Sequence, residues 1–190
     1  MARAIYLTHP EVAIDPAIAV TDWQLSDVGA RRVQAVAQRL DLHGCLIVSS
    51  AERKALETAW PLAAAAGTSV VVRPQMHEND RSATGYLAGP EFEATADAFF
   101  ADPENTVRGW ERAVDAQARI VAEVRAVLEQ SSGCEVVFCG HGAVGTLLYC
   151  ALSGLGISRK WDQTLGGSWF SFDTHALKPE AHWRAMEDLV

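Results

Sequence analysis

Four short runs of apolar residues, at positions 3–8, 45–49, 68–73 and 135–139, constrain the fold of this chain more than any other feature. Each run is continuous rather than alternating, which is the pattern of a strand covered on both faces, as in a parallel sheet. Between the runs, apolar residues recur at helical spacing. Strands that alternate with helices predict a three-layer α/β/α sandwich with a mostly parallel sheet.

Further helices and a fifth strand extend this prediction. One helix begins after Ser26, a residue type that caps helix N-termini, and reaches about residue 40, with Val28 on its apolar side. Others are predicted over about 52–65 and 109–130, and after His141 to about residue 152. The last strand is predicted over 168–173. Residues 74–108 form a long polar insertion with a short helical piece, which is typical of a lid or side wall of a site.

Length and charge narrow the function. A chain of 190 residues with 49% hydrophobic content predicts one domain over residues 1–190. Acidic residues number 24 and basic residues 16, which disfavours nucleic acid and anionic membranes as partners. A small anionic ligand remains compatible with this charge, because a few local cations suffice to bind it.

The cysteines, the first residues and the histidine spacing predict a cytoplasmic protein without a cofactor. The four cysteines form no C-x-x-C pair and lie mostly in apolar segments, so we expect reduced thiols. The first residues carry too short an apolar stretch for a signal peptide, and no apolar run is long enough to cross a bilayer. No pair of histidines has the spacing of a known zinc motif, so no metal is predicted.

Polar residues follow the predicted strands at the carboxyl ends, where open parallel sheets bind their ligands. His9 follows the first strand, and His141 follows the fourth and opens directly into a helix. Lys54 lies in the first turn of the helix after the second strand, and Glu78 lies after the third strand. We therefore expect these four side chains to converge on one site.

This set of side chains suits phosphoryl transfer. A neutral imidazole is a competent nucleophile, and a second imidazole with nearby cations can stabilise charge on the phosphoryl oxygens. A carboxylic acid can protonate the leaving alkoxide. The glycine-rich turn at Gly142 opens a helix, and the free N–H groups and positive dipole end of a helix start bind anions.

The segments LTHPE, SSAERKALETA, MHEND and CGHGAVG resemble, in order and spacing, the motifs of the histidine phosphatase superfamily, the phosphoglycerate-mutase-like group. The resemblance implies a metal-independent phosphatase that acts on a phosphomonoester. It implies that His9 is the phosphorylated nucleophile, His141 the second histidine and Glu78 the proton donor. It also implies a mostly parallel sheet with an antiparallel edge strand, which residues 168–173 would form.

Four positions depart from the family patterns. Thr8 replaces the arginine before the nucleophile, and Pro10 replaces the glycine after it. Lys54 replaces the arginine of the second motif, and Cys139-Gly140 stands where the family has the serine before the second histidine. Thr8 removes a guanidinium that can bind two phosphate oxygens at once, and Lys54 presents a point charge instead of a fork.

Arg81 is the best candidate to replace the lost guanidinium, ahead of Arg108 and Arg112, because it lies three residues after Glu78 in a dense polar cluster. The residues predicted to bind a small phosphate ester or phosphate are Thr8, Lys54, Arg81 and Gly142. Two alternatives remain open. The fold could be a catalytically weak or inactive module that binds a phospholigand, or the two histidines could act as acid and base on an unphosphorylated substrate.

Overall fold

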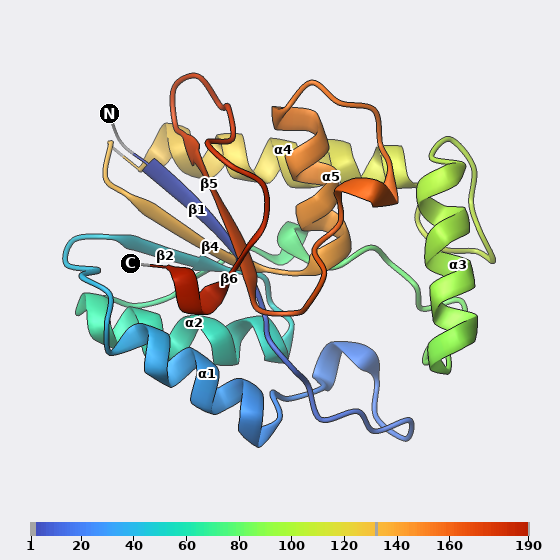
Figure 1. Cartoon of the computed structure of the whole chain (residues 1–190), viewed down its shortest axis with the longest axis horizontal. Coiled ribbons are helices and arrows are strands. Elements are labelled where there is room, and N and C mark those ends of the chain that lie inside the picture. Colours follow the sequence, from blue (N-terminus) through green and yellow to red (C-terminus); the bar gives the residue numbers. More distant parts are fainter. Residues whose placement is uncertain (1–2, 132, 190) are drawn as a thin grey trace.

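A central sheet carries helices on both faces (Figure 1). The computed structural model describes residues 3–131 and 133–189. Within these residues the sheet has six strands in the order β3-β2-β4-β1-β5-β6, of which the first four are parallel and the last two antiparallel to their neighbours. The strands are β1 (Arg3–Thr8), β2 (Leu46–Ser49), β3 (Val71–Val72), β4 (Val136–Gly140), β5 (Ser168–Asp173) and β6 (Arg184–Ala185). The predicted mostly parallel α/β sheet is confirmed.

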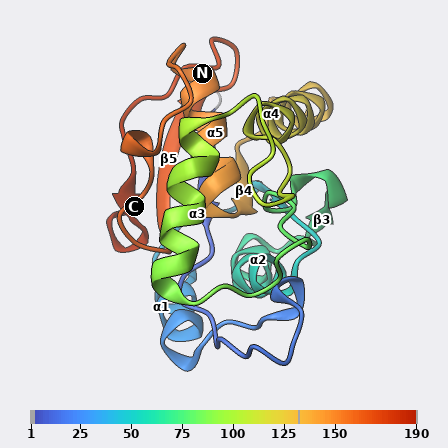
Figure 2. The ribbon, with the colours of Figure 1, turned by 90° about the vertical axis from the view of Figure 1, so that its right-hand side faces the viewer.

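Alternate residues of β1 face two separate hydrophobic layers. Ile5 and Leu7 pack in the layer under α1 (Asp27–Ala37) and α2 (Arg53–Ala66). Tyr6 packs in the opposite layer, under α4 (Ala113–Gln130) and α5 (Gly142–Leu152). Figures 1 and 2 show α3 (Gly89–Ala101), which belongs to the insertion at 74–108, beyond the carboxyl ends of the parallel strands. Short 3-10 turns complete the described elements: η1 (Val20–Asp22), η2 (Pro74–Met76), η3 (Arg159–Trp161) and η4 (Met186–Asp188).

Two strand predictions need correction. The strand predicted over 68–73 spans only Val71–Val72, and both side chains are exposed, at 39% and 45%. The reason is that β3 forms an edge of the sheet and has β2 on one side only. The predicted edge strand, β5, lies one position inside the sheet, because β6 pairs with its outer side.

Helix boundaries follow local chemistry. Ser26 caps α1 as predicted, since its Oγ accepts a hydrogen bond from the Gly29 N–H at 3.1 Å. Val28, predicted on the apolar side, is 49% exposed, so that assignment is wrong. The helix predicted from 109 begins at Ala113 instead, because Arg108 and Gly109 have φ values of 53° and 81°, which right-handed helices exclude.

The first turn of α1 packs against the backbone of Glu11. Ser26 N–H donates to the Glu11 carbonyl at 2.9 Å, and a Cβ on Gly29 would lie 2.3 Å from that same oxygen. We expect Gly29→Ala to lower the free energy of unfolding by about 1–3 kcal/mol, because backbone must move to admit the methyl group. Urea denaturation measures the change, with Gly156→Ala as the control, since a Cβ there meets open space. Equal stability of Gly29→Ala and the wild type would contradict this packing.

The structure also bears on the predictions about membrane-spanning helices and cysteines. Among the residues that the structure describes, none of the helices is both long and apolar enough to cross a bilayer. The cysteines all lie within the described residues and are free thiols, with Cys45, Cys139 and Cys150 buried.

Candidate active site

His9 stands at the carboxyl end of β1, as predicted. Its N–H donates to the Gly140 carbonyl at 3.0 Å, and its own carbonyl accepts from Gly167 at 2.9 Å. The ring nitrogen Nδ1 lies 2.8 Å from the Pro10 carbonyl oxygen. Because a carbonyl can only accept, Nδ1 carries the proton, and Nε2 keeps its lone pair in the neutral ring. Pro10 therefore orients the imidazole and leaves Nε2 as its nucleophilic atom.

His141 follows β4, the neighbour of β1, and occupies the N-cap position of α5. The ring centroids of His9 and His141 lie 5.4 Å apart, and the ring planes are inclined by 70°. His141 is fully buried, with Nε2 at 2.7 Å from Ser50 Oγ and 3.5 Å from Glu52 Oε1. Its Nδ1 has no hydrogen-bond partner among the described residues. The sheet thus brings the two predicted histidines, one fully buried and one half-buried, into one site.

Burial lowers the pKa of both imidazoles. For His9 burial is the main cause, and the pKa falls to about 4 although the Pro10 carbonyl favours the charged ring. For His141 burial lowers the pKa well below its usual value, against the opposing effect of Glu52. Both rings are therefore neutral at pH 7, which is the state that a histidine nucleophile requires.

These lowered pKa values predict a loss of stability in mild acid. In the unfolded chain both histidines take up protons near pH 6.5, whereas in the folded protein they remain neutral to lower pH. The unfolded state then binds more protons, so the free energy of unfolding falls as the pH decreases from about 6.5 toward 4. For His9 alone the loss is on the order of 3 kcal/mol.

Urea denaturation at several pH values between about 4.5 and 7.5 measures this effect. His9→Asn should flatten the pH dependence of stability, because asparagine does not titrate. The same change at His43, which is exposed, should leave the dependence as in the wild type. Parallel profiles for His9→Asn and the wild type would show that His9 does not have the lowered pKa.

Glu78 reaches the first turn of α5. Its Oε1 accepts from the Val144 N–H at 3.0 Å, and its Oε2 accepts from the Ala143 N–H at 3.2 Å. Burial raises the pKa of Glu78, with Arg81 opposing this shift and Glu52 adding to it. A carboxyl group with a raised pKa keeps its proton to a higher pH than an ordinary carboxyl group and can give that proton to a leaving group. The structure thus brings Glu78 next to His141, on the helix that His141 caps.

Lys54 lies in the interior rather than on the surface of α2, with 3% of its side chain exposed. Its Nζ donates to the Val20 carbonyl at 2.8 Å and to the carboxylate of Glu52. Burial alone would raise the pKa of Glu52, but the cation of Lys54 and the hydrogen bond from the Glu78 N–H lower it, so the carboxylate is ionised. Lys54 therefore has a charge partner within the protein. The sequence did not single out Glu52, because the family pattern leaves its position open.

Thr8 is fully buried and uses its hydroxyl inside the protein. The Oγ1 accepts from the Ser168 N–H at 2.9 Å and donates to Gln163 Oε1 at 2.7 Å. Gln163 lies between η3 and β5, next to Gly142, where a Cβ would stand 2.6 Å from Gln163 Nε2. Thr8 thus positions Gln163, which sequence reasoning missed because it lies outside the four motifs.

A cavity of about 420 Å³ opens beside His9. Its wall includes Glu78, Arg81, Gly142 and Gln163. The helix α3 supplies another side of this wall, with Phe92, Glu93, Ala96, Phe99 and Phe100. The insertion at 74–108 therefore contributes a side wall to the site.

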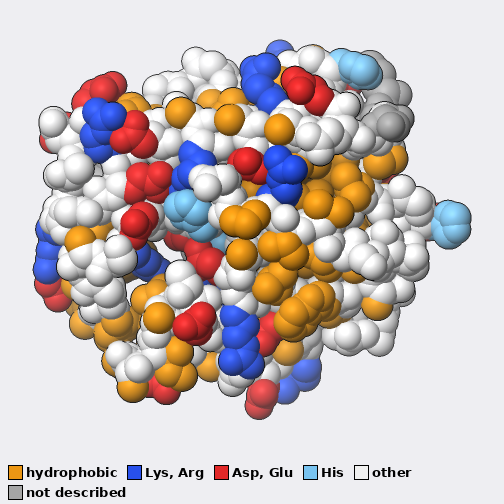
Figure 3. Space-filling view, turned by 180° about the vertical axis from the view of Figure 1, so that it is seen from behind, with side chains coloured by type: hydrophobic (Ala, Val, Ile, Leu, Met, Phe, Trp, Pro, Cys, Tyr) orange, Lys and Arg blue, Asp and Glu red, His pale blue; other side chains and the backbone are white. Residues whose placement is uncertain are grey.

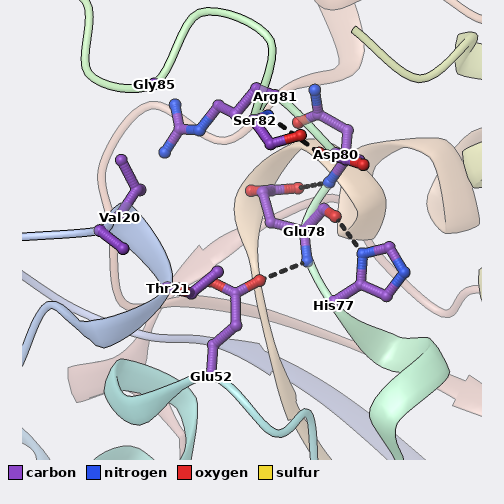
Figure 4. A pocket seen from close by; sticks show the side chains of 11 residues that line it. Val20, Thr21, Glu52, His77, Glu78, Asp80, Arg81, Ser82 and Gly85 are labelled. Carbon is purple, nitrogen blue, oxygen red and sulfur yellow. Dashed lines mark hydrogen bonds between the residues drawn. The ribbon is translucent and has the colours of Figure 1, made fainter.

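A second cavity, of about 400 Å³, is also lined by Glu78 and Arg81. Figure 4 shows Glu52 and Arg81 at opposite ends of this cavity, with Val20 beside them. The space-filling view in Figure 3 shows a hollow bordered by acidic and basic side chains. Charged groups of both signs thus surround the predicted site.

Arg81 lines both cavities, as its position after Glu78 predicts. Its guanidinium lies over the Phe92 ring, 5.0 Å from the centroid, and has no ion pair or hydrogen bond with the described residues. The two other candidates lie elsewhere in ion pairs, Arg108 with Glu91 and Arg112 with Asp115. Arg81 is therefore the candidate guanidinium that the site can use.

Fold and site together define an α/β protein in which two neutral histidines, an acid and a helix start meet at the carboxyl edge of the sheet. The chain belongs to the histidine phosphatase superfamily (branch 1), whose family model matches residues 14–178. The match begins shortly after His9, beyond the segment in which Thr8 and Pro10 depart from the family's opening pattern.

Solved structures, phosphatases among them, share this fold. A mycobacterial glucosyl-3-phosphoglycerate phosphatase in complex with inorganic phosphate is 28% identical, with a TM-score of 0.72 over 97% of this chain and 95% of that chain. A phosphoserine phosphatase from Entamoeba histolytica, in complex with 3-phosphoglyceric acid, is 17% identical, with a TM-score of 0.78 over 100% of both chains. YhfR from Bacillus stearothermophilus is 19% identical, with a TM-score of 0.80 over 95% of both chains. No curated protein matches the chain.

Proposed function

We propose that the protein is a single-domain, metal-independent phosphatase that hydrolyses a small phosphate ester through a phosphohistidine on His9. The observation that carries this proposal is the 2.8 Å contact between His9 Nδ1 and the Pro10 carbonyl, in a ring that is neutral at pH 7. It leaves Nε2 as an oriented nucleophile beside a cavity. The similarity to a glucosyl-3-phosphoglycerate phosphatase supports a phosphate ester as the substrate class.

The reaction has two steps. His9 Nε2 attacks phosphorus in line, so that an N–P bond forms and the P–O bond to the leaving group breaks. The leaving alkoxide takes the proton of Glu78. Water then returns a proton to Glu78 and attacks phosphorus, and the N–P bond breaks, which restores neutral His9. His141, Arg81 and the N–H of Gly142 stabilise the phosphoryl oxygens during both steps.

One observation favours a second candidate, a module that binds a phospholigand without turnover. Thr8 carries no charge, and Lys54 is paired with Glu52, so two cations of the family site are missing or neutralised. Losing one such donor typically lowers kcat by about 10²–10³. In that case Arg81 and Gln163 have to donate the hydrogen bonds that bind the phosphate oxygens.

A panel of phosphate esters, tested by thermal shift and by release of the alcohol, separates the two candidates. Release of the alcohol that His9→Asn abolishes supports the phosphatase and excludes a contaminating enzyme. Thermal stabilisation by esters, with no release from any of them, supports the binding module. We expect chelation by EDTA to leave turnover unchanged. The free thiols agree with a cytoplasmic protein, the compartment that the sequence predicts.

A further inference from the structure

A carboxylate lies next to His141, in the wall of the second cavity and not of the cavity beside His9. Glu52 Oε1 lies 3.5 Å from His141 Nε2 and accepts from the Glu78 N–H at 2.8 Å, while Oε2 contacts Lys54 Nζ. The side chain is 8% exposed and lines the cavity of Figure 4. A phosphoryl group that contacts both histidines therefore lies a few ångströms from a fixed negative charge.

With Glu78 protonated, the charged side chains nearest the two histidines sum to a single positive charge. Lys54 and Arg81 are cations, and Glu52 is an anion that offsets one of them. Glu78 is neutral when it holds the proton that the leaving group will take. Neutral imidazoles and amides add hydrogen bonds to the site but no charge.

Other charged groups near the cavities add no free cation. Arg159 lines the larger cavity but contacts two acids of α3, Glu93 and Asp97. Asp162 lines the same cavity, and Asp80 lines the second. The outer walls therefore carry an excess of negative charge, which disfavours a ligand with two negative charges.

We propose that Glu52 makes this site selective for a phosphoryl group with one negative charge, which at neutral pH is a phosphodiester. This inference rests on the proposed function and names its substrate class. A monoanion matches the single positive charge of the pocket, whereas a monoester dianion leaves one charge unbalanced beside Glu52.

The two steps balance for such a substrate. Attack by His9 Nε2 breaks one of the two P–O ester bonds, and the alcohol leaves with the proton of Glu78. Water then breaks the N–P bond and returns a proton to Glu78. The product is a phosphomonoester, which carries one more negative charge than the substrate at neutral pH and is therefore held less tightly by this pocket.

Calorimetric binding at about pH 8 tests the selectivity without turnover, because methyl phosphate is then a dianion and dimethyl phosphate a monoanion. We expect the wild type to bind dimethyl phosphate more tightly than methyl phosphate. Glu52→Gln removes the carboxylate charge with little change in shape, and should bind methyl phosphate on the order of tenfold or more tightly than the wild type. Affinity for dimethyl phosphate should change less.

Glu91→Gln is the matched control, because it removes the same charge from the exposed surface of α3, where Glu91 pairs with Arg108. It should leave both affinities as in the wild type. If Glu52→Gln fails to fold, the relative affinities of the wild type for dimethyl phosphate and methyl phosphate test the proposal. Tighter binding of methyl phosphate, or no binding of either ligand, overturns the proposal.

The binding and hydrolysis measurements test the charge selectivity and the phosphatase proposal separately. Preference for dimethyl phosphate without hydrolysis of any ester supports the charge selectivity and contradicts the phosphatase. Hydrolysis of monoesters by a protein that prefers methyl phosphate contradicts the selectivity and leaves the phosphatase in place.

Discussion

Replacement of His9 by asparagine is expected to lower kcat by about 10⁴-fold or more. Asparagine keeps a polar side chain at the end of β1 but offers no nucleophilic nitrogen, so the covalent route is lost entirely. The Nε2 of His141 is already in contact with Ser50 and Glu52, so it does not replace the Nε2 of His9. Initial rates with 4-nitrophenyl phosphate and with bis(4-nitrophenyl) phosphate measure the loss.

The control for this variant is His43→Asn, which makes the same change at an exposed position and should keep full activity. Thermal unfolding of both variants verifies that each is folded. Activity of His9→Asn above about 1% of the wild type is incompatible with a nucleophile whose loss costs several orders of magnitude.

Replacement of Glu78 by glutamine is expected to lower kcat by about 10²–10⁴ for alkyl esters and far less for 4-nitrophenyl esters. An alkoxide needs the proton of Glu78 in order to leave, whereas 4-nitrophenolate leaves without one. Glutamine can still accept a hydrogen bond from the first turn of α5, so the fold of the site is retained. Equal losses for both classes of ester would show that Glu78 does not donate the proton.

The pH dependence of kcat is an independent test of Glu78 as the proton donor. Its pKa is raised by burial, so the acid form persists to a higher pH than in an ordinary carboxyl group. For alkyl esters kcat should fall as the pH rises through this raised pKa, because the proton donor is then lost. In Glu78→Gln this fall should disappear.

Much of the fold is predictable because continuous apolar runs indicate covered strands. The runs that became β1, β2 and β4 lie at the centre of the sheet and are buried on both faces. The run at 68–73 has the same composition, yet Val71 and Val72 are exposed. Composition cannot distinguish a central strand from an edge strand, because the difference depends on which neighbours pair with it. β6 is only two residues long and gives no pattern at all.

Some residues of the candidate site were also predictable from the sequence, and others were not. His9 and His141 were predictable from topology alone, because parallel neighbours end at one edge of the sheet. The ion pair of Glu52 with Lys54 was not predictable, since a charged pair two residues apart in a helix start normally faces solvent. Gln163 was not predictable either, because its position beside Gly142 depends on a contact with Thr8, 155 positions away along the chain.

Rapid quenching of the reaction with a ³²P-labelled ester tests the phosphohistidine most directly. We expect a protein-bound label that is stable in alkali and labile in acid, approaches one per chain, and maps to the peptide that contains His9. The label should be absent from His9→Asn and unchanged in His43→Asn. Turnover without any protein-bound label, or a label on another residue such as His141, would contradict the account.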